Sequence, residues 1–300
     1  MLVPDHDEGR LGSANLLTQV HQRTQAALAC GALQPIETHY TFIEQRGIRF
    51  LLRILANVER KVKVTHARRQ KDPNFNPFLP YDPELWVGDF SATHVCLLNK
   101  FNVVADHILI VTQAFEPQTH WLTIADFDAL AFGLNQIDGL GFYNGGTAAG
   151  ASQPHKHLQL VPFPMLPNGE PLPIEKAIAT LSNTAPVLNP LSLFPFHHAL
   201  VRLPEQLDAQ VLHNAYQQAL VAVQLSTPAT VLAGTQTGAY NLLVTRQWLL
   251  LVPRQQDEWE DISVNSLGFA GTLFVKNVQQ QARLVEIGPL ELLKAVAIAR

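Results

Sequence analysis

The sequence has few cysteines and few charged side chains. Among its 300 residues only Cys30 and Cys96 carry thiols, and no C-x-x-C spacing occurs. Neither a disulfide framework nor a four-thiolate zinc site is available, so a cytoplasmic, reducing location is the simplest expectation. Charged residues make up 15% of the chain, against roughly 25% in ordinary globular domains. The 47% hydrophobic content nonetheless excludes a disordered chain.

Long apolar runs and an excess of basic charge are also missing. No uninterrupted apolar stretch approaches the ~18 residues that a membrane-spanning helix needs, and residues 1–10 lack the apolar core of a signal peptide. Because 25 Asp and Glu outnumber 21 Lys and Arg, the net charge is −4. We therefore expect neither nucleic acid nor a membrane as a partner. A short polyanion could still bind where basic residues cluster.

The basic residues do cluster in one segment. Six of the 21 fall within twelve positions that contain no acid, namely Arg60, Lys61, Lys63, Arg68, Arg69 and Lys71. Such a run is either a solvated loop or an anion contact. The prolines between Pro73 and Pro83 then predict an extended, ordered loop.

The periodicity of apolar residues predicts a mixed α+β chain. Helical spacing predicts helices over residues 11–29, 126–137, 203–223 and 290–298. Short apolar or alternating runs predict strands over residues 38–42, 48–55, 93–98, 107–112, 155–161, 239–245, 248–252 and 273–278. The segments near residues 104 and 246 have a similar pattern of apolar residues, which indicates two α+β halves that are distant repeats.

The most informative segment combines a glycine-rich stretch, predicted to be a loop, with a polar strand. Side chains alternate between the two faces of a strand, so His155, His157 and Gln159 are expected to project together. Upstream glycines would let backbone N–H groups approach an anion closely; they are Gly141, Gly145, Gly146 and Gly150. An imidazole beside such a loop is well placed to attack phosphorus.

Three interpretations of this segment stay open on spacing alone. The glycines do not form a Walker loop, because G-x-x-x-x-G continues with Ala151 and Ser152 in place of Lys and Ser or Thr. Two histidines two positions apart on a strand also suit a metal pair, and either could be a core histidine satisfied by its neighbours. Phosphorus chemistry, a metal site and a structural role are all compatible with these residues.

Residues 150–162, G-A-S-Q-P-H-K-H-L-Q-L-V-P, resemble the active-site strand of the histidine-triad superfamily in its transferase branch, where H-x-H-x-Q replaces H-x-H-x-H. The closer resemblance is to the ATP adenylyltransferase, or diadenosine tetraphosphate phosphorylase, family. It extends over nearly the whole chain through N-P-F-L-P-Y (76–81), L-N-K-F-N-V-V (98–104), H-I-L-I-V-T (107–112), Y-N-G-G (143–146), Y-N-L-L-V-T-R-Q-W-L-L-L-V-P-R (240–254) and N-S-L-G-F-A-G (265–271).

This resemblance implies an α+β histidine-triad-like fold whose central antiparallel sheet is built from two related halves flanked by helices. The expected halves are residues 1–170, which carry the catalytic strand, and 171–300, which complete the fold, unless both form one integrated domain. The implied reaction is reversible phosphorolysis of diadenosine tetraphosphate to ADP and ATP through an adenylyl-histidine, with phosphate or sulfate as acceptor. A hydrolase of the same superfamily and a non-catalytic nucleotide sensor are the alternatives.

The resemblance also assigns roles to residues. His157 is the expected nucleophile, Gln159 is expected to bind phosphate oxygens, and His155 to orient or support; His107 is expected to pack beside the site. The substrate-binding residues expected on this basis are Asn99, Lys100, Phe101, Asn144, Gly145, Gly146, Ser152 and Gln153. Two phosphate ligands are expected on other grounds: Lys63 from the basic segment and Lys276 from its place in the second half. We expect no covalently bound cofactor, although a divalent cation such as magnesium can accompany the polyphosphate. The expected partners are small-molecule nucleotides and phosphate, and the chain is expected to be a monomer or dimer.

Overall fold

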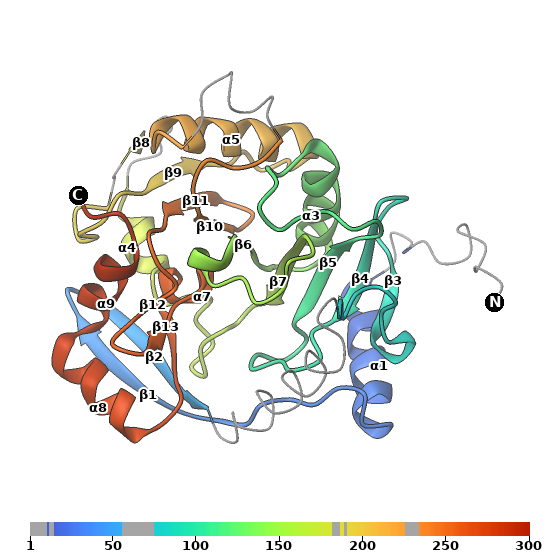
Figure 1. Ribbon diagram of the computed structural model, residues 1–300, viewed down its shortest axis with the longest axis horizontal. Helices are drawn as coiled ribbons and strands as arrows, with labels where there is room; N and C mark the ends of the chain where they lie inside the picture. Colours follow the sequence, from blue (N-terminus) through green and yellow to red (C-terminus); the bar gives the residue numbers. More distant parts are fainter. Residues whose placement is uncertain (1–10, 12–14, 56–74, 182–186, 189–190, 226–233) are drawn as a thin grey trace.

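The computed structural model describes residues 11, 15–55, 75–181, 187–188, 191–225 and 234–300. These residues form a mixed α+β fold with a nine-stranded sheet, a three-stranded sheet and a two-stranded ribbon (Figure 1). The predicted α+β class, with a large antiparallel sheet and helices against it, is therefore confirmed. No helix within the described ranges is both long and apolar enough to cross a membrane.

The large sheet consists of β3 (Trp86–Asp89), β4 (His94–Leu98), β5 (Ile108–Thr112), β6 (Gly139–Gly145), β7 (His157–Pro162), β8 (Val187–Leu188), β9 (Ala199–Arg202), β10 (Tyr240–Val244) and β11 (Trp248–Pro253). The smaller sheet consists of β1 (Thr38–Gln45), β2 (Ile48–Leu55) and β14 (Thr272–Val275), and the ribbon of β12 (Glu258–Trp259) and β13 (Ile262–Ser263). The helices are α1 (Leu16–Ala29), α3 (Ile124–Gln136), α4 (Glu175–Ala179), α5 (Ala209–Ala222), α7 (Ser266–Phe269), α8 (Val278–Ile287) and α9 (Pro289–Val296), with 3-10 turns η1 (Pro83–Leu85) and η2 (Thr147–Ala149).

The two halves of the large sheet have the same topology. The chain runs through β4, β5, α3, β6 and β7 in the first half and through β8, β9, α5, β10 and β11 in the second. The sheet order is β3-β4-β5-β7-β6-β10-β11-β9-β8, so the second half mirrors the strand order of the first. All neighbours are antiparallel, and β6 meets β10 at the centre with Asn144 opposite Asn241.

The two faces of the large sheet are covered differently. Helices α1, α3 and α5 lie on one face, along the right and top of Figure 1, and share a core with Cys96, Ile110 and Leu158. On the other face, β2, β14, α7 and α9 cover the second half, where Leu243 and Leu250 are buried. Over β4 and β5 this second face carries a smaller, separate apolar cluster, formed by Phe78, Val95, Leu97, Leu109 and Val111.

Local sequence signals fix several helix ends. Thr123 and Asp126 form a reciprocal capping box at the start of α3. The Asp208 side chain accepts from the Val211 N–H, so α5 begins at Ala209, six residues later than the predicted start. Helix α8 is absent from the prediction.

Strand β6 corrects the expectation that the glycine-rich stretch is a loop throughout. Residues 139–145 are a fully buried central strand. A Cβ atom on Gly139 would collide with the Val161 carbonyl oxygen, and one on Gly141 would lie 2.6 Å from the Leu130 side chain. These glycines therefore let β7 and α3 pack closely against β6, which glycine content alone cannot reveal.

The strand that carries the H-x-H-x-Q motif also begins later than predicted. β7 starts at His157, whereas His155 forms an isolated bridge with Pro117. The predicted halves, residues 1–170 and 171–300, both contribute strands to the one large sheet.

Candidate active site

His157 stands at the start of β7, on the same sheet face as Gln159 and the core residue Val161. Its Nδ1 lies 2.8 Å from the main-chain oxygen of His155. A carbonyl only accepts, so Nδ1 carries the proton and Nε2 keeps its lone pair; no residue that the structure describes hydrogen-bonds this Nε2. Burial lowers the pKa of His157 to about 4, so the ring is neutral at pH 7. A neutral imidazole with a free Nε2 is the state that attacks phosphorus.

His155 has the opposite arrangement. Its Nε2 lies 2.8 Å from the Thr112 carbonyl oxygen, so Nε2 carries the proton. Its Nδ1 lies 2.9 Å from the Asn76 side-chain amide nitrogen, which donates to it. The ring is fully buried, and burial lowers its pKa. With both nitrogens engaged, His155 has no lone pair for a phosphorus atom or a metal ion, so it fits the structural interpretation.

A histidine metal pair is therefore not what the two side chains form. Metal ligation needs a free ring nitrogen on each histidine, and only His157 offers one. Among the residues that the structure describes, no group of three or more His, Cys, Asp or Glu side chains is arranged to hold a metal ion.

Gln118 holds the backbone of the site and has no motif in the sequence that marks it. Its Oε1 accepts from the His157 N–H at 2.8 Å, and its Nε2 donates to the Asn144 carbonyl at 2.9 Å. The side chain is buried, and the Tyr143 hydroxyl donates to its main-chain oxygen. Gln118 thus links β6 to β7 where the loop between them separates the two strands, which fixes the backbone under His157.

Lys156 points to the opposite face of the strand and is fully buried. Its Nζ donates to Glu116 at 2.6 Å, to Asp126 at 3.2 Å and to the Trp121 carbonyl at 3.3 Å. Burial alone would raise the pKa of Asp126, but the hydrogen bond with His94 and the charge of Lys156 hold it below its usual range. This buried ionic cluster uses all three ammonium donors, so Lys156 anchors the strand and is not available to a ligand.

Gln159 lies two residues after His157 on the same face. Its Oε1 lies 2.9 Å from Nε2 of His107. The Nε2 amide group of Gln159 has no hydrogen-bond partner in the parts of the chain that the structure describes. Its two N–H donors are therefore available to an anion beside His157.

Asn144 lies on the same face as His157 and Gln159, because Phe142 pairs with Gln159 across β6 and β7. Its Oδ1 accepts from Asn241 at 2.9 Å and from Ser266 at 2.8 Å. These donors fix the amide orientation, so the Nδ2 donors face away from them. The structure thus brings Asn144 together with the two strand residues.

Gly145 and Gly146 follow directly and are required by packing and by the backbone conformation. A Cβ atom on Gly145 would lie 2.9 Å from the Gln236 side chain and 3.0 Å from the Tyr240 ring. Gly146 has a φ of 94°, which side chains other than glycine rarely tolerate. Ser152 and Gln153 lie further along the same loop, with Ser152 exposed.

The predicted nucleoside residues lie in the loop between β4 and β5. The Asn99 amide nitrogen lies 3.2 Å from Nδ1 of His107, and its Oδ1 accepts from the Phe101 N–H at 3.3 Å. Lys100 pairs with Asp82 at 3.3 Å, and Phe101 is half-buried. Asn99 and Lys100 thus already contact protein groups.

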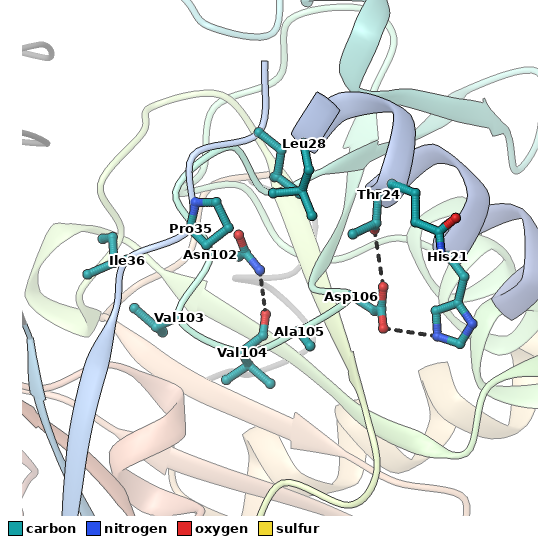
Figure 2. A pocket seen from close by; sticks show the side chains of 12 residues that line it. His21, Thr24, Leu28, Pro35, Ile36, Asn102, Val103, Val104, Ala105 and Asp106 are labelled. Carbon is teal, nitrogen blue, oxygen red and sulfur yellow. Dashed lines mark hydrogen bonds and ion pairs between the residues drawn. The ribbon is translucent and has the colours of Figure 1, made fainter. Parts of the chain in front are cut away.

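A cavity of about 400 Å³ lies beside this loop, between α1 and residues 102–106 (Figure 2). Figure 2 shows Asp106 directed at Thr24 and His21 of α1. No residue of the H-x-H-x-Q strand lines the cavity, so it is separate from the His157 face.

Two further predicted residues are not brought to this face by any recorded contact. Lys276 follows β14 and is exposed, with its main-chain N–H bonded to Gln280. Lys63 lies outside the residues that the structure describes.

The fold and site together define an α+β protein in which a buried, neutral histidine, His157, presents an unprotonated ring nitrogen. Two protein-family models match it: the Ap4A phosphorylase N-terminal domain over residues 6–180 and the ATP adenylyltransferase C-terminal domain over residues 192–299. The chain therefore belongs to the Ap4A phosphorylase family, and the predicted membership is confirmed.

Relatives with recorded names agree with this membership. Protein APA1 of Saccharomyces cerevisiae is 28% identical over 304 aligned positions, which cover 91% of this chain and 90% of that protein. Diadenosine 5',5'''-P1,P4-tetraphosphate phosphorylase 2 of the same yeast is 31% identical over 249 positions, 73% of each chain. The crystal structure of yeast Ap4A phosphorylase Apa2 in complex with Ap4A shares the fold, with a TM-score of 0.76 at 24% identity, covering 95% of this chain and 98% of that one.

Proposed function

We propose that this protein is a nucleotidyltransferase that phosphorolyses diadenosine tetraphosphate to ADP and ATP through a covalent adenylyl group on His157. The observation that carries the proposal is the difference between the two histidines of the motif. His155 uses both ring nitrogens within the protein, whereas His157 presents an unprotonated Nε2. A relative named as a diadenosine tetraphosphate phosphorylase, 31% identical, supports the choice of substrate.

The first step is attack of the His157 Nε2 lone pair on the α-phosphorus of the substrate. A phosphorus–nitrogen bond forms, the bond from that phosphorus to its bridging oxygen breaks, and ATP leaves. The ring becomes cationic while Nδ1 keeps its proton, and the His155 carbonyl 2.8 Å away stabilises that charge. The amide donors of Gln159 and Asn144 are on the same face to bind the phosphoryl oxygens.

The second step returns the histidine to its starting state. An oxygen of inorganic phosphate attacks the same phosphorus, the phosphorus–nitrogen bond breaks, and ADP forms. Gln159 cannot act as a general acid or base, which favours transfer to a phosphate oxygen that is already ionised over activation of water. Sulfate, with equally ionised oxygens, is a second candidate acceptor.

The finer features of the prediction belong to this proposal. We infer a histidine-triad-like fold with two related halves, a cytoplasmic location, and a divalent cation that arrives with the polyphosphate. Lys63 and Lys276 are proposed phosphate ligands, and Phe101, Ser152 and Gln153 proposed nucleotide contacts. The shared topology of the two halves of the sheet supports the repeat.

The proposal is tested by mass spectrometry of the protein mixed with diadenosine tetraphosphate in the absence of phosphate. We expect one AMP adduct, on a peptide that contains His157, and its release as ADP when phosphate is added. His157→Asn should give no adduct. Wild type serves as the positive control for a folded, reactive protein. An adduct on His155, or AMP release without phosphate, would contradict the proposal.

A further inference from the structure

A second histidine, His107, contacts the site through Gln159. It lies directly before β5, is 5% exposed, and packs its ring against Phe142. Its Nε2 lies 2.9 Å from Oε1 of Gln159, and its Nδ1 lies 3.2 Å from the side-chain amide nitrogen of Asn99. Asn99, His107 and Gln159 thus form a continuous hydrogen-bonded chain that ends beside His157.

The direction of this chain follows from its two ends. The Asn99 amide nitrogen can only donate, so Nδ1 of His107 must accept and carries no proton. The proton of the neutral ring is then on Nε2, which donates to the Gln159 oxygen. The chain therefore fixes the amide of Gln159 with its oxygen toward His107 and its N–H groups toward the His157 face.

Orientation matters for a glutamine because its two ends are nearly identical in shape and opposite in polarity. With the amide reversed, the Gln159 oxygen would face the phosphate oxygens and repel them. Around metal sites, comparable outer hydrogen bonds orient the ligating groups, and their loss typically lowers affinity or activity about tenfold to a hundredfold.

The loop that carries the chain is itself anchored. The Asn99 N–H donates to the His107 carbonyl at 2.9 Å, which closes the loop between β4 and β5. At its tip, Asp106 accepts from Thr24 at 3.1 Å and pairs with His21 at 3.0 Å, as Figure 2 shows. Helix α1 thus holds the loop, which fixes the positions of Asn99 and His107 relative to Gln159.

We propose that His107 is a positioning residue, which acts on transfer by holding the Gln159 amide with its N–H groups toward the phosphoryl oxygens. This inference rests on the proposed function. It concerns orientation only, so His107 exchanges no proton with the substrate.

The test compares two substitutions of His107 and a double-mutant cycle. His107→Phe keeps the ring shape and the packing on Phe142 but removes the donor. His107→Gln keeps an N–H donor near the position of Nε2. The readout is the single-turnover rate of adduct formation from diadenosine tetraphosphate without phosphate, at saturating substrate. We expect H107F to react about tenfold to a hundredfold more slowly than wild type, and H107Q to react faster than H107F.

The cycle separates positioning from a general structural effect. If His107 acts through Gln159, adding H107F to Gln159→Ala should slow the reaction no further than Q159A alone. Multiplicative effects of the two substitutions, or an H107F variant as fast as wild type, would overturn the inference. Failure of the proposed function looks different, because then wild type itself forms no adduct. Matching thermal unfolding midpoints identify the variants that can be compared.

Discussion

The hairpins β6–β7 and β10–β11 occupy equivalent positions in the two halves of the large sheet, but their connecting loops differ in length. Between β6 and β7 the chain makes an eleven-residue excursion, residues 146–156, which holds the 3-10 turn η2 and leads into His157. Between β10 and β11 it turns back within residues 245–247. The same framework therefore supports a polar loop in one half and only a tight turn in the other.

The strand registers extend this comparison to single residues. His107 precedes β5 and His198 precedes β9, so these two histidines align the halves. Val111, four residues after His107, pairs with His157. Arg202, four residues after His198, pairs with Trp248, so His157 corresponds to Trp248. By the same count, Gln159 corresponds to Leu250. Trp248 and Leu250 are fully buried beneath β2, β14, α7 and α9. The difference teaches that one half places polar side chains where the other half uses the same positions for core packing.

Copying the second half into the first should give the largest effect. Gln159→Leu places the residue of position 250 next to His157 and removes two N–H donors from the reacting phosphoryl group. Loss of one such donor costs about 10²–10³-fold in turnover, so we expect at least that fall in kcat, measured by phosphorolysis under saturating substrate. Leu250→Val is the matched control: it should lower the free energy of unfolding by about 1 kcal/mol and leave kcat unchanged. Equal kcat values for Q159L and L250V would break the comparison.

The sequence predicts which side chains share a strand face, but not the long-range contacts that they make. Alternation along residues 155–161 correctly identifies His157 and Gln159 as neighbours on one face, because strand geometry depends only on local spacing. It cannot separate His155 from His157, since their opposite proton positions depend on Asn76 and Thr112, which are distant in the chain.

Long-range contacts also explain the other omissions. Gly139 and Gly141 look like loop residues until Val161 and Leu130 are placed against them. Gln118 belongs to no motif, and only the folded chain brings its side chain between two strands. The family resemblance supplies residue roles that spacing alone leaves open.

The pH dependence of adduct formation should show how far burial lowers the pKa of His157. Desolvation lowers the pKa of His157 to about 4, and the reactive form is the neutral ring, which predominates above that pH. Between pH 8 and pH 5 the single-turnover rate of adduct formation should therefore change by less than about twofold, whereas a histidine of ordinary pKa would slow about thirtyfold at pH 5. A half-maximal rate near pH 6.5 would show that His157 is not desolvated in solution.

The pH dependence of the free energy of unfolding should be affected alike by His157 in the first half and His198 in the second. Burial lowers the pKa of His198 to about 4, as it does for His157, while both titrate near 6.5 in the unfolded chain. The unfolded state then binds more protons between these values, so each histidine stabilises the fold fully above pH 6.5 and loses that contribution as the pH falls toward 4.

Replacing either histidine tests this equivalence. Each should contribute up to about 1.4 kcal/mol per pH unit to the slope of the unfolding free energy, so His198→Gln and His157→Gln should flatten the slope by similar amounts in urea titrations between pH 4.5 and 6.5. Only H157Q should also abolish adduct formation. An unchanged slope in H198Q would mean that its imidazole is already hydrated in the native state, and the two halves would then differ in solvation as well as in chemistry.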